Sequence, residues 1–543
     1  MFKTHIAHMA YMQGDQAYAE VDRKWKATCR VLLGGEVGEL DDFAPWLSEF
    51  KRESTIRQSD ESGKEAVFGV LPYYDGSKWL AFDDVHFEKK YGPISINDCK
   101  DIDSLIEAVS ERIYYTGSVV LGNSGSVQSS SYIIDAFFVY RSEQVFESKY
   151  VAYATHVIYS DCLFGGQCTS CTFGIRTNNY LSQRNFEVHK VDYSSDIYYS
   201  HGLSGCAECM FSFNLKNKRH AIGNLQLEPS KYSAIKKKLL GEFRNELAEK
   251  KRLPSLLEIA SQQKPELSGV RRASSSSAHF KSEKPDLVPI GQAFSETSAI
   301  ILGKPRSAIQ SYAGWLSKEG AVFEGGKSCV SGSPLQLSDY AHFLKFPRDR
   351  LLTQQEADAS GEKMHISEEE AGKLSLSTIP SAITKIAFFC PIWEVGTNKN
   401  NIDCPTSIDS ANCLRCVINV KSKSCAYNFW PRNSETIFGS YSCGISSSFC
   451  MKCYFSKNLA RCFEVDAGRN CSDCYYCHNV ENCHDCILCF NVKNLRYAIG
   501  NRELPKEEYL KVKARVLAEI NSQLDSSRAV RQRVFSLLEK KKK

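Results

Sequence analysis

Two consecutive twelve-residue segments share one pattern, and this short repeat limits the possible folds more than any other feature of the chain. The segments read Cys-Ser-Asp-Cys-Tyr-Tyr-Cys-His-Asn-Val-Glu-Asn over 471–482 and Cys-His-Asp-Cys-Ile-Leu-Cys-Phe-Asn-Val-Lys-Asn over 483–494. A twelve-residue period is too short for a helix pair, which needs roughly 34 residues or more. It suits one coil of a β-solenoid, in which successive coils stack about 4.8 Å apart.

Stacked coils place like residues in columns, and the repeat predicts what each column contains. Cysteine and valine suit a cramped interior, and asparagine suits the corners because it tolerates left-handed backbone. Weaker traces of the pattern occur over 450–459, and the first half of the chain keeps the pairs Cys168/Cys171 and Cys206/Cys209. We therefore predict short β-solenoid-like zones lined by an inward ladder of thiols.

The whole chain also reads as a tandem duplication. Residues 186–224 align with 463–501 without a gap, and an upstream block around Trp46 matches one around Trp315 in the same order. After each repeat zone, apolar residues recur at helical spacing. The predicted fold class is α+β, a tandem duplication in which each half has a head domain, a short β-solenoid-like Cys-rich repeat zone and a helical tail.

The predicted boundaries follow from these anchors. The first half has a head domain over 1–125, a repeat zone over 126–225 and a helical tail over 226–261. A Ser/Lys/Pro-rich linker over 262–290 joins it to the second half. The second half has a head domain over 291–400, a Cys-rich repeat zone over 401–502 and a basic helical tail over 503–543.

The closing block of the second half resembles a known group of proteins. Its Cys-x-x-Cys units are followed by Asn-Val-Lys-Asn-x-x-Tyr-Ala-Ile-Gly-Asn over 491–501 and Pro-Lys-Glu-Glu-Tyr over 505–509. This arrangement resembles uncharacterised cysteine-rich repeat proteins of candidate-phylum bacteria and large phages. Members often open with zinc-ribbon-like cysteine pairs, and this chain has no such pair before Cys168. The resemblance implies no particular activity.

The 23 cysteines leave two interpretations open. Without a secretory signal we expect a reducing compartment, where clustered cysteines indicate metal sites or buried thiols rather than disulfides. Four of them have the spacing of a tetrahedral zinc site: Cys471, Cys474, Cys483 and Cys486. The first half has Ser194 and Ile197 where the second has Cys471 and Cys474, which favours a thiol ladder. The predicted cofactor is therefore none, or zinc.

A polar pattern, Asp-x-Tyr-Tyr-x-His, occurs once in each half. Its members are Asp196, Tyr198, Tyr199 and His201 in the first half and Asp473, Tyr475, Tyr476 and His478 in the second. They are candidates for a partner-binding surface or a proton-transfer group. The structural alternative is a corner held by the aspartate with aromatic stacking beside it.

Basic residues gather in the two tails. The candidates for contact with a nucleic-acid backbone are Lys236, Lys237, Lys238, Lys250, Lys251, Arg252, Lys540, Lys541 and Lys542. Acidic residues interleave with the first six, so a solvated helix face explains the same pattern. The formal net charge of +5 is small for 543 residues and does not by itself indicate nucleic acid.

These features favour binding over catalysis. No catalytic triad, nucleotide loop or acid/base pair stands out, although the head domains leave an enzyme open. No stretch approaches ~18 apolar residues, so we expect a cytoplasmic protein without a membrane span. The predicted function is a non-enzymatic interaction or scaffold protein that presents duplicated faces to a protein or macromolecular assembly. The alternative is a zinc-stabilised, nucleic-acid- or ribosome-associated protein, and the oligomeric state stays open.

Overall fold

The structure is a computed structural model that describes residues 14–51, 54–69, 71–94, 100–275, 285–320, 323–338, 345–442 and 445–539. It confirms that the chain mixes helices with several β-sheets. Two compact units are present, and neither follows the order of the chain. Unit 1 contains residues 1–52, 123–282 and 323–393, and unit 2 contains residues 53–122, 283–322 and 394–543.

Each unit therefore takes a segment from the other half of the sequence. We name these segments insert 1 (residues 53–122), which belongs to unit 2, and insert 2 (residues 323–393), which belongs to unit 1. The region 1–125, predicted as one head domain, is divided between the two units, and so is the region 291–400.

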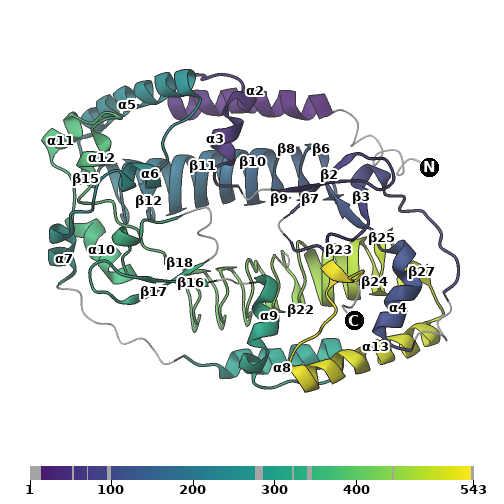
Figure 1. Cartoon of the computed structure of the whole chain (residues 1–543). Coiled ribbons are helices and arrows are strands. Elements are labelled where there is room, and N and C mark those ends of the chain that lie inside the picture. The colour runs from purple at the N-terminus through teal and green to yellow at the C-terminus, as the bar shows by residue number, and fades with distance from the viewer. Residues whose placement is uncertain are drawn as a thin grey trace. The chain divides into compact units, whose positions relative to one another are not determined.

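The centre of unit 1 is a stack of short strands, which we name stack 1 (residues 125–226; Figure 1). Neighbouring strands are parallel and paired residues are usually twelve positions apart, as in Ser195 with Ala207 and Ile197 with Cys209. The last two strands pair antiparallel and end the stack. The strands are β6 (Gly125–Gln128), β7 (Ser131–Ile134), β8 (Phe137–Tyr140), β9 (Glu143–Phe146), β10 (Lys149–Ile158), β11 (Asp161–Asp192), β12 (Ser195–His201), β13 (Ala207–Met210), β14 (Arg219–Ile222) and β15 (Leu225–Gln226).

Unit 2 contains the corresponding stack 2 (residues 406–503). Ser472 pairs with His484 and Cys474 with Cys486, again in parallel and twelve residues apart, and an antiparallel pair ends the stack. Its strands are β19 (Thr406–Ile408), β20 (Ile418–Val420), β21 (Glu435–Phe438), β22 (Ser448–Met451), β23 (Lys457–Glu481), β24 (His484–Ile487), β25 (Phe490–Lys493), β26 (Arg496–Ile499) and β27 (Arg502–Glu503). Strand β18 (Trp393–Val395) precedes them.

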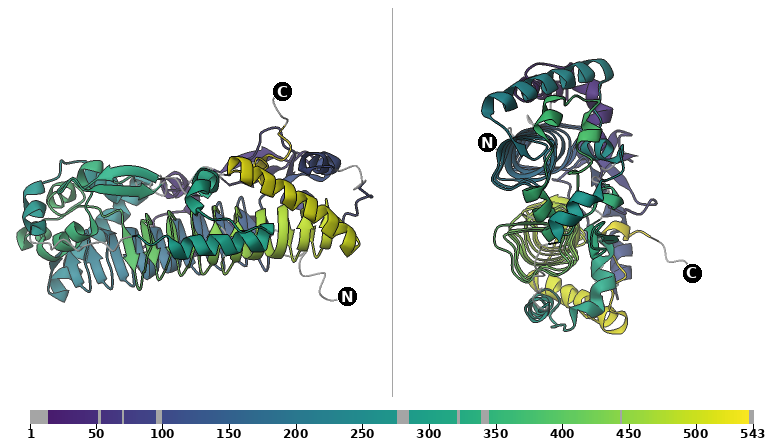
Figure 2. Two further views of the ribbon diagram at one scale, coloured as in Figure 1. Left: turned by 90° about the horizontal axis from the view of Figure 1, so that it is seen from below. Right: turned by 90° about the vertical axis from the view of Figure 1, so that its left-hand side faces the viewer.

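Both stacks bend the backbone at every third residue over most of their length, and Figure 2 shows each stack end-on as nested coils. In one coil of stack 2 the left-handed residues are Asp473, Tyr476, Asn479 and Asn482. The residue two positions before each of these is buried in a single interior cluster. Twelve residues therefore make four short sides, and every third side chain points into a narrow interior.

Helices flank each stack within its own unit (Figures 1 and 2). Unit 1 has α2 (Gly14–Leu33), α3 (Ala44–Ser48), α5 (Pro229–Lys250), α6 (Leu256–Ser261) and α7 (Leu267–Ser274), and unit 2 has α8 (Val288–Leu302), α9 (Ala313–Gly320) and α13 (Lys506–Ser527). Helix α7 lies inside the predicted linker, and its Val270 is buried with Leu352 and Phe388 of insert 2. Among the described helices, none combines the length and apolar character needed to cross a bilayer.

The inserts are small and mixed in structure. Insert 1 has β1 (Thr55–Gln58), β2 (Glu65–Phe68), β3 (Trp79–Ala81), α4 (Ile102–Val109), β4 (Tyr115–Gly117) and β5 (Val120–Leu121). Insert 2 has β16 (Phe323–Lys327), β17 (Pro334–Ser338), α10 (Gln354–Lys363), α11 (Glu368–Gly372) and α12 (Ile379–Ala382). Capping boxes start α4, α10 and α11, with Asp101, Thr353 and Ser367 as the N-caps.

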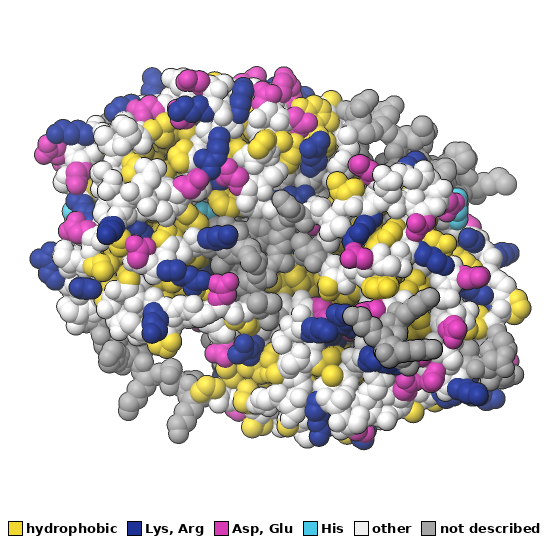
Figure 3. Space-filling view, in the orientation of Figure 1, with side chains coloured by type: hydrophobic (Ala, Val, Ile, Leu, Met, Phe, Trp, Pro, Cys, Tyr) yellow, Lys and Arg dark blue, Asp and Glu magenta, His cyan; other side chains and the backbone are white. Residues whose placement is uncertain are grey.

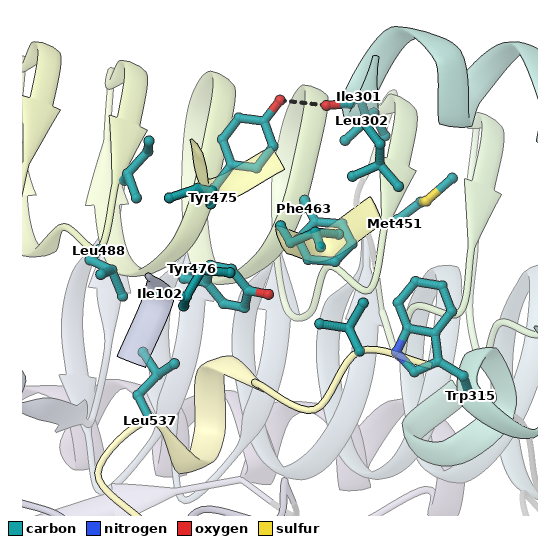
Figure 4. Packing of buried hydrophobic residues seen from close by; sticks show 14 of the residues in the cluster. Ile102, Ile301, Leu302, Trp315, Met451, Phe463, Tyr475, Tyr476, Leu488 and Leu537 are labelled. Carbon is teal, nitrogen blue, oxygen red and sulfur yellow. Dashed lines mark hydrogen bonds between the residues drawn. The ribbon is translucent and has the colours of Figure 1, made fainter. Parts of the chain in front are cut away.

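The largest core of unit 2 lies outside the coils. It joins α4 of insert 1, α8, α13 and the outward side chains of stack 2, including Phe463, Tyr475 and Leu488 (Figure 4). Insert 1 is therefore part of the hydrophobic core of unit 2 rather than an appendage.

Candidate functional site

The doubled Asp-x-Tyr-Tyr-x-His pattern does not form one cluster in either unit, because its side chains leave the stack in different directions. Each aspartate pairs with an arginine one coil earlier. Arg184 donates two hydrogen bonds to Asp196 at 2.9 and 2.7 Å, and Arg461 pairs with Asp473 in the same way. These bidentate pairs hold one corner of the coil.

The first tyrosine of each pattern connects its stack to a flanking helix, whereas the second, Tyr199, donates to Pro254 O at 3.1 Å in unit 1. The hydroxyl of Tyr198 donates to Leu32 O at the end of α2 at 3.0 Å. The hydroxyl of Tyr475 donates to Ile301 O near the end of α8 at 2.7 Å (Figure 4). Both acceptors belong to the last turn of a helix, where carbonyl groups lack a partner within the helix. The two bonds occupy matching positions in the two halves.

The histidines hold the inserts, and in unit 1 the insert comes from the second half of the chain. His201 Nε2 accepts a hydrogen bond from the backbone N–H of Cys390 at 3.2 Å. Asn214 Nδ2 donates to Phe388 O at 3.1 Å. The ring of Phe389 packs against His201 with centroids 5.0 Å apart and against Phe213 at 5.8 Å.

In unit 2 the same contacts hold insert 1, from the first half. His478 Nε2 accepts from the backbone N–H of Thr116 at 2.8 Å, and Asn491 Nδ2 donates to Tyr114 O at 2.9 Å. The ring of Tyr115 packs against His478 at 5.4 Å and against Phe490 at 5.6 Å. We name each set of histidine, asparagine and phenylalanine an insert-docking surface.

The environment of the two histidines differs. His478 Nδ1 lies 2.9 Å from Asp466 Oδ2, and this carboxylate also accepts from the Tyr73 hydroxyl at 2.5 Å. In unit 1 the position of Asp466 is occupied by His189, and burial, with Lys190 nearby, holds the pKa of His201 well below its usual range. A neutral His201 ring is therefore required, because its Nε2 accepts rather than donates.

The thiols of the interior cysteines lie within hydrogen-bond distance of backbone carbonyl groups. Cys474 Sγ lies 3.4 Å from Ser472 O and 3.5 Å from Cys483 O, so its single hydrogen can be donated to either carbonyl. The same two contacts, to the residue two positions earlier and the residue nine positions later, recur at Cys471, Cys477, Cys483, Cys486 and Cys489. The thiols thus satisfy carbonyl groups at the corners of the coils.

The four predicted zinc ligands are members of these columns. Cys474 and Cys486 pair in neighbouring strands, and Cys471 and Cys483 repeat the arrangement in the next column. Every cysteine of the described residues is a free thiol. Within those residues no group of three or more His, Cys, Asp or Glu side chains is arranged to hold a metal ion. Burial raises the pKa of the Cys471 thiol well above its usual value.

Most basic candidates of the first tail are already engaged within unit 1. Five of the six have partners there: Lys236, Lys238, Lys250, Lys251 and Arg252. For example, Lys236 Nζ lies over the Tyr198 ring at 4.8 Å, and Lys251 pairs with Asp42 at 3.3 Å. On the face shown in Figure 3, basic and acidic side chains are interspersed. Lys540, Lys541 and Lys542 lie outside the described residues.

A buried ionic cluster in each unit was missed by the sequence analysis. In unit 1 the fully buried Arg176 donates to Glu187 Oε2 at 2.7 Å and to Glu49 Oε2 at 2.9 Å, and also bonds to Trp46 O. Glu187 in turn accepts from Leu256 N at 3.0 Å. The cluster joins the coil to α3 and to the start of α6.

Unit 2 repeats this function with different residues. Lys452 donates to Trp315 O at 3.0 Å and pairs with Glu319, while Glu464 accepts from Val534 N at 3.0 Å. Burial raises the pKa of Glu464 to about 8. The signal available in the sequence was the Phe-Glu-Val triplet shared by the two halves, which contains both Glu187 and Glu464.

A polar hollow of about 250 Å³ in unit 2 contains the acidic residues that would suit an acid/base site. Its carboxylates already have partners. Asp60 accepts from Trp79 N at 2.6 Å, Asp84 accepts from two serine hydroxyls at 2.5 Å, and Glu61 lies 3.2 Å from His86. These carboxylates stabilise the turns of insert 1.

Comparison of the chain with models of protein families, with curated proteins and with solved structures finds no match. The geometry of the units is therefore the basis for the functional inference.

Proposed function

We propose that the protein is a non-enzymatic scaffold: a tandem duplication with two β-solenoids that presents their outer surfaces to a partner protein or assembly. The twelve-residue register of both stacks and the matching contacts of Tyr198 with Leu32 and Tyr475 with Ile301 support the duplicated solenoid. The chemistry-bearing groups of the repeats are directed at the backbone, at helix ends and at the inserts, so their roles are explained without a substrate.

The observation that carries the proposal is an apolar ridge on stack 1, formed by Leu181 and Tyr193. Both residues have left-handed backbone, with φ of 47°. They lie one coil apart, because Gln183 pairs with Ser195 in the same register. Leu181 is 39% exposed and Tyr193 is 51% exposed. The Tyr193 ring also packs edge-to-face against Tyr180, with ring centroids 5.9 Å apart. Adjoining apolar side chains that stay partly exposed offer a contact area to a protein partner.

The surroundings of the ridge favour a protein partner. Two cations lie within three residues of the ridge along the chain, and both have partners. Arg184 makes a bidentate pair with Asp196. The buried Lys190 donates to Pro391 O, so neither cation is available to a phosphate. In stack 2 the matching column carries Asn458 and Asn470, both exposed. It continues as an amide ladder in which Asn470 donates to Asn482 at 3.3 Å. The two halves thus present different surfaces at the same column, and the apolar one belongs to unit 1.

Site-specific photo-cross-linking tests this proposal. A photoreactive aromatic residue replaces Tyr193, and the matched control replaces Asn470 at the corresponding position of stack 2. We expect a discrete protein adduct from position 193 alone, unchanged by moderate salt and lost when Leu181→Ser is added. Adducts at both positions, or adducts with nucleic acid that disappear in moderate salt, would contradict the proposal, and the second would favour the nucleic-acid alternative.

A further inference from the structure

Each half of the sequence is incomplete without the other, and the exchange is reciprocal. Insert 2, from the second half, is held by His201 and Asn214 of stack 1. Insert 1, from the first half, is held by His478 and Asn491 of stack 2. Both units are therefore assembled from the same two pieces, residues before and after the segment 276–284.

The exchange extends beyond the docking surfaces. In unit 1, Lys363 of α10 donates to Ala273 O of α7 at 3.0 Å, and Gly223 O accepts from Ile366 N at 2.9 Å. In unit 2, Glu519 of α13 accepts from Ile102 N of insert 1 at 2.7 Å, and Gly500 O accepts from Arg112 at 2.6 Å. Gly223 and Gly500 are the matching glycines of the shared Ala-Ile-Gly-Asn motif.

We propose that these surfaces also act between molecules, so that a second copy of this chain can complete each half and the two chains form a closed dimer. In this dimer the first half of one chain packs with the second half of the other. Every non-covalent contact described above is kept, and each chain contributes one of its halves to each of the two complexes. Exchange of identical elements through one connecting segment is a low-cost route to symmetric dimers.

Each docking surface binds backbone groups and an aromatic ring of an insert, and the insert of a second copy of the chain has the same groups. His201 and His478 bind backbone N–H groups, and the two asparagines bind backbone carbonyl groups. An aromatic ring, Phe389 or Tyr115, fills the space between them. Within one chain the connecting segment keeps the halves at a high effective concentration, so the monomer is favoured in dilute solution and the dimer forms when chains fold at high concentration.

The test uses the full chain with a protease site introduced within 276–284. After cleavage under native conditions, we expect native mass spectrometry to show one complex with the mass of the whole chain. Light and isotopically heavy cleaved proteins are then unfolded and refolded together. Hybrids of a light first half with a heavy second half should appear in the proportion of random pairing. Fragments that separate on cleavage, or that refold without pairing, would overturn the proposal.

The uncut chain gives the second measurement. Refolding at high concentration should produce a dimer that is absent after refolding at low concentration, as judged by native mass spectrometry, and cleavage at 276–284 should convert this dimer into complexes of one chain mass. A dimer that survives cleavage would have a different interface and would contradict the exchange.

A variant pair connects the result to the docking surface. Phe389→Ala removes the ring between His201 and Phe213 and should weaken the association of the cleaved halves by roughly 100-fold or more. The control, Tyr198→Phe, removes a buried hydrogen bond between two residues of the first half and should leave the association unchanged. Equal effects of both changes would indicate general loss of stability and would count against the assigned surface.

Discussion

Replacement of Cys471 by serine separates a structural thiol ladder from a zinc site. The residue is 2% exposed, and its Sγ lies 3.2 Å from Arg469 O and 3.5 Å from Val480 O. The matching residue of stack 1 is Ser194, whose hydroxyl donates to Asp192 O at 2.7 Å. Serine can therefore take the place of the thiol with the same carbonyl as its acceptor.

The expected change in the free energy of unfolding follows from the interactions that Cys471→Ser removes and adds. A hydroxyl is smaller and more polar than a thiol, so its burial loses on the order of 1 kcal/mol of packing and transfer free energy. The hydroxyl–carbonyl hydrogen bond returns about 1 kcal/mol. We expect Cys471→Ser to change the free energy of unfolding by no more than about 1 kcal/mol. Cys471→Ala leaves the carbonyl without this partner and should cost roughly 1–3 kcal/mol.

A zinc site predicts a different outcome. Structural zinc contributes roughly 10 kcal/mol or more to folding in small zinc domains, so loss of one of four ligands would unfold the region around 471–489. The assay is urea unfolding followed by circular dichroism under reducing conditions, with and without a chelator. A loss above about 3 kcal/mol for Cys471→Ser, or unfolding of the wild type by the chelator, would refute the thiol ladder.

Three further predictions follow from the structure. Because burial raises the pKa of Glu464 to about 8, the stability it contributes is full below about pH 4.5 and is lost as pH rises towards 8, so Glu464→Gln should flatten the fall in urea midpoint over this range. Because burial lowers the pKa of His201, the wild type should lose thermal stability as pH falls below about 6.5, and His201→Gln should reduce that loss. A Cβ at Gly500 would lie 2.4 Å from Val109, whereas Gly303 has open space and only a left-handed φ. Gly500→Ala should therefore lower the free energy of unfolding by about 3 kcal/mol and Gly303→Ala by about 1 kcal/mol in urea titrations.

The register of the strands could be predicted from the sequence because the repeat fixes it locally. A twelve-residue period brings Cys474 beside Cys486, and the structure pairs these two residues. The spacing of Tyr509, Val512 and Val516 likewise predicted the buried face of α13. In both cases the signal is contained within a short window, where a side chain's neighbours are set by the local geometry of the backbone.

The exchange of the inserts could not be predicted, because its contacts join residues far apart in the chain. His201 and Cys390 are 189 residues apart, and His478 and Thr116 are 362 apart. The duplicated histidines were found from the sequence, but their partners were not, since Thr116 and Cys390 differ in type. The histidines bind backbone N–H groups, which every residue except proline has. The sequence therefore does not indicate which N–H group will bind the ring nitrogen.

The sequence grouped the residues of the candidate cluster, but it did not predict the contacts that each of them makes. Asp196, Tyr198 and His201 are close in sequence, and proximity suggested one surface or a proton-transfer group. A backbone that turns at every third residue instead sends neighbouring side chains in different directions, to an arginine, a helix end and an insert. The Asp-x-Tyr-Tyr-x-His pattern is thus repeated in the two halves because its residues make three separate structural contacts.

The polar residues shared by the two halves determine where the inserts dock. The carbonyl of Tyr114 and the N–H of Thr116 flank Tyr115, a residue of the apolar core of unit 2, and a buried backbone group without a partner costs roughly 1–3 kcal/mol. His478 and Asn491 remove this penalty in one position of the insert, and a shift of one residue along the stack would restore it. Aromatic packing supplies most of the affinity in such an arrangement, while the histidine and asparagine fix the register. The doubled His and Asn positions are thus explained by the specificity of assembly, which both halves require in the same way.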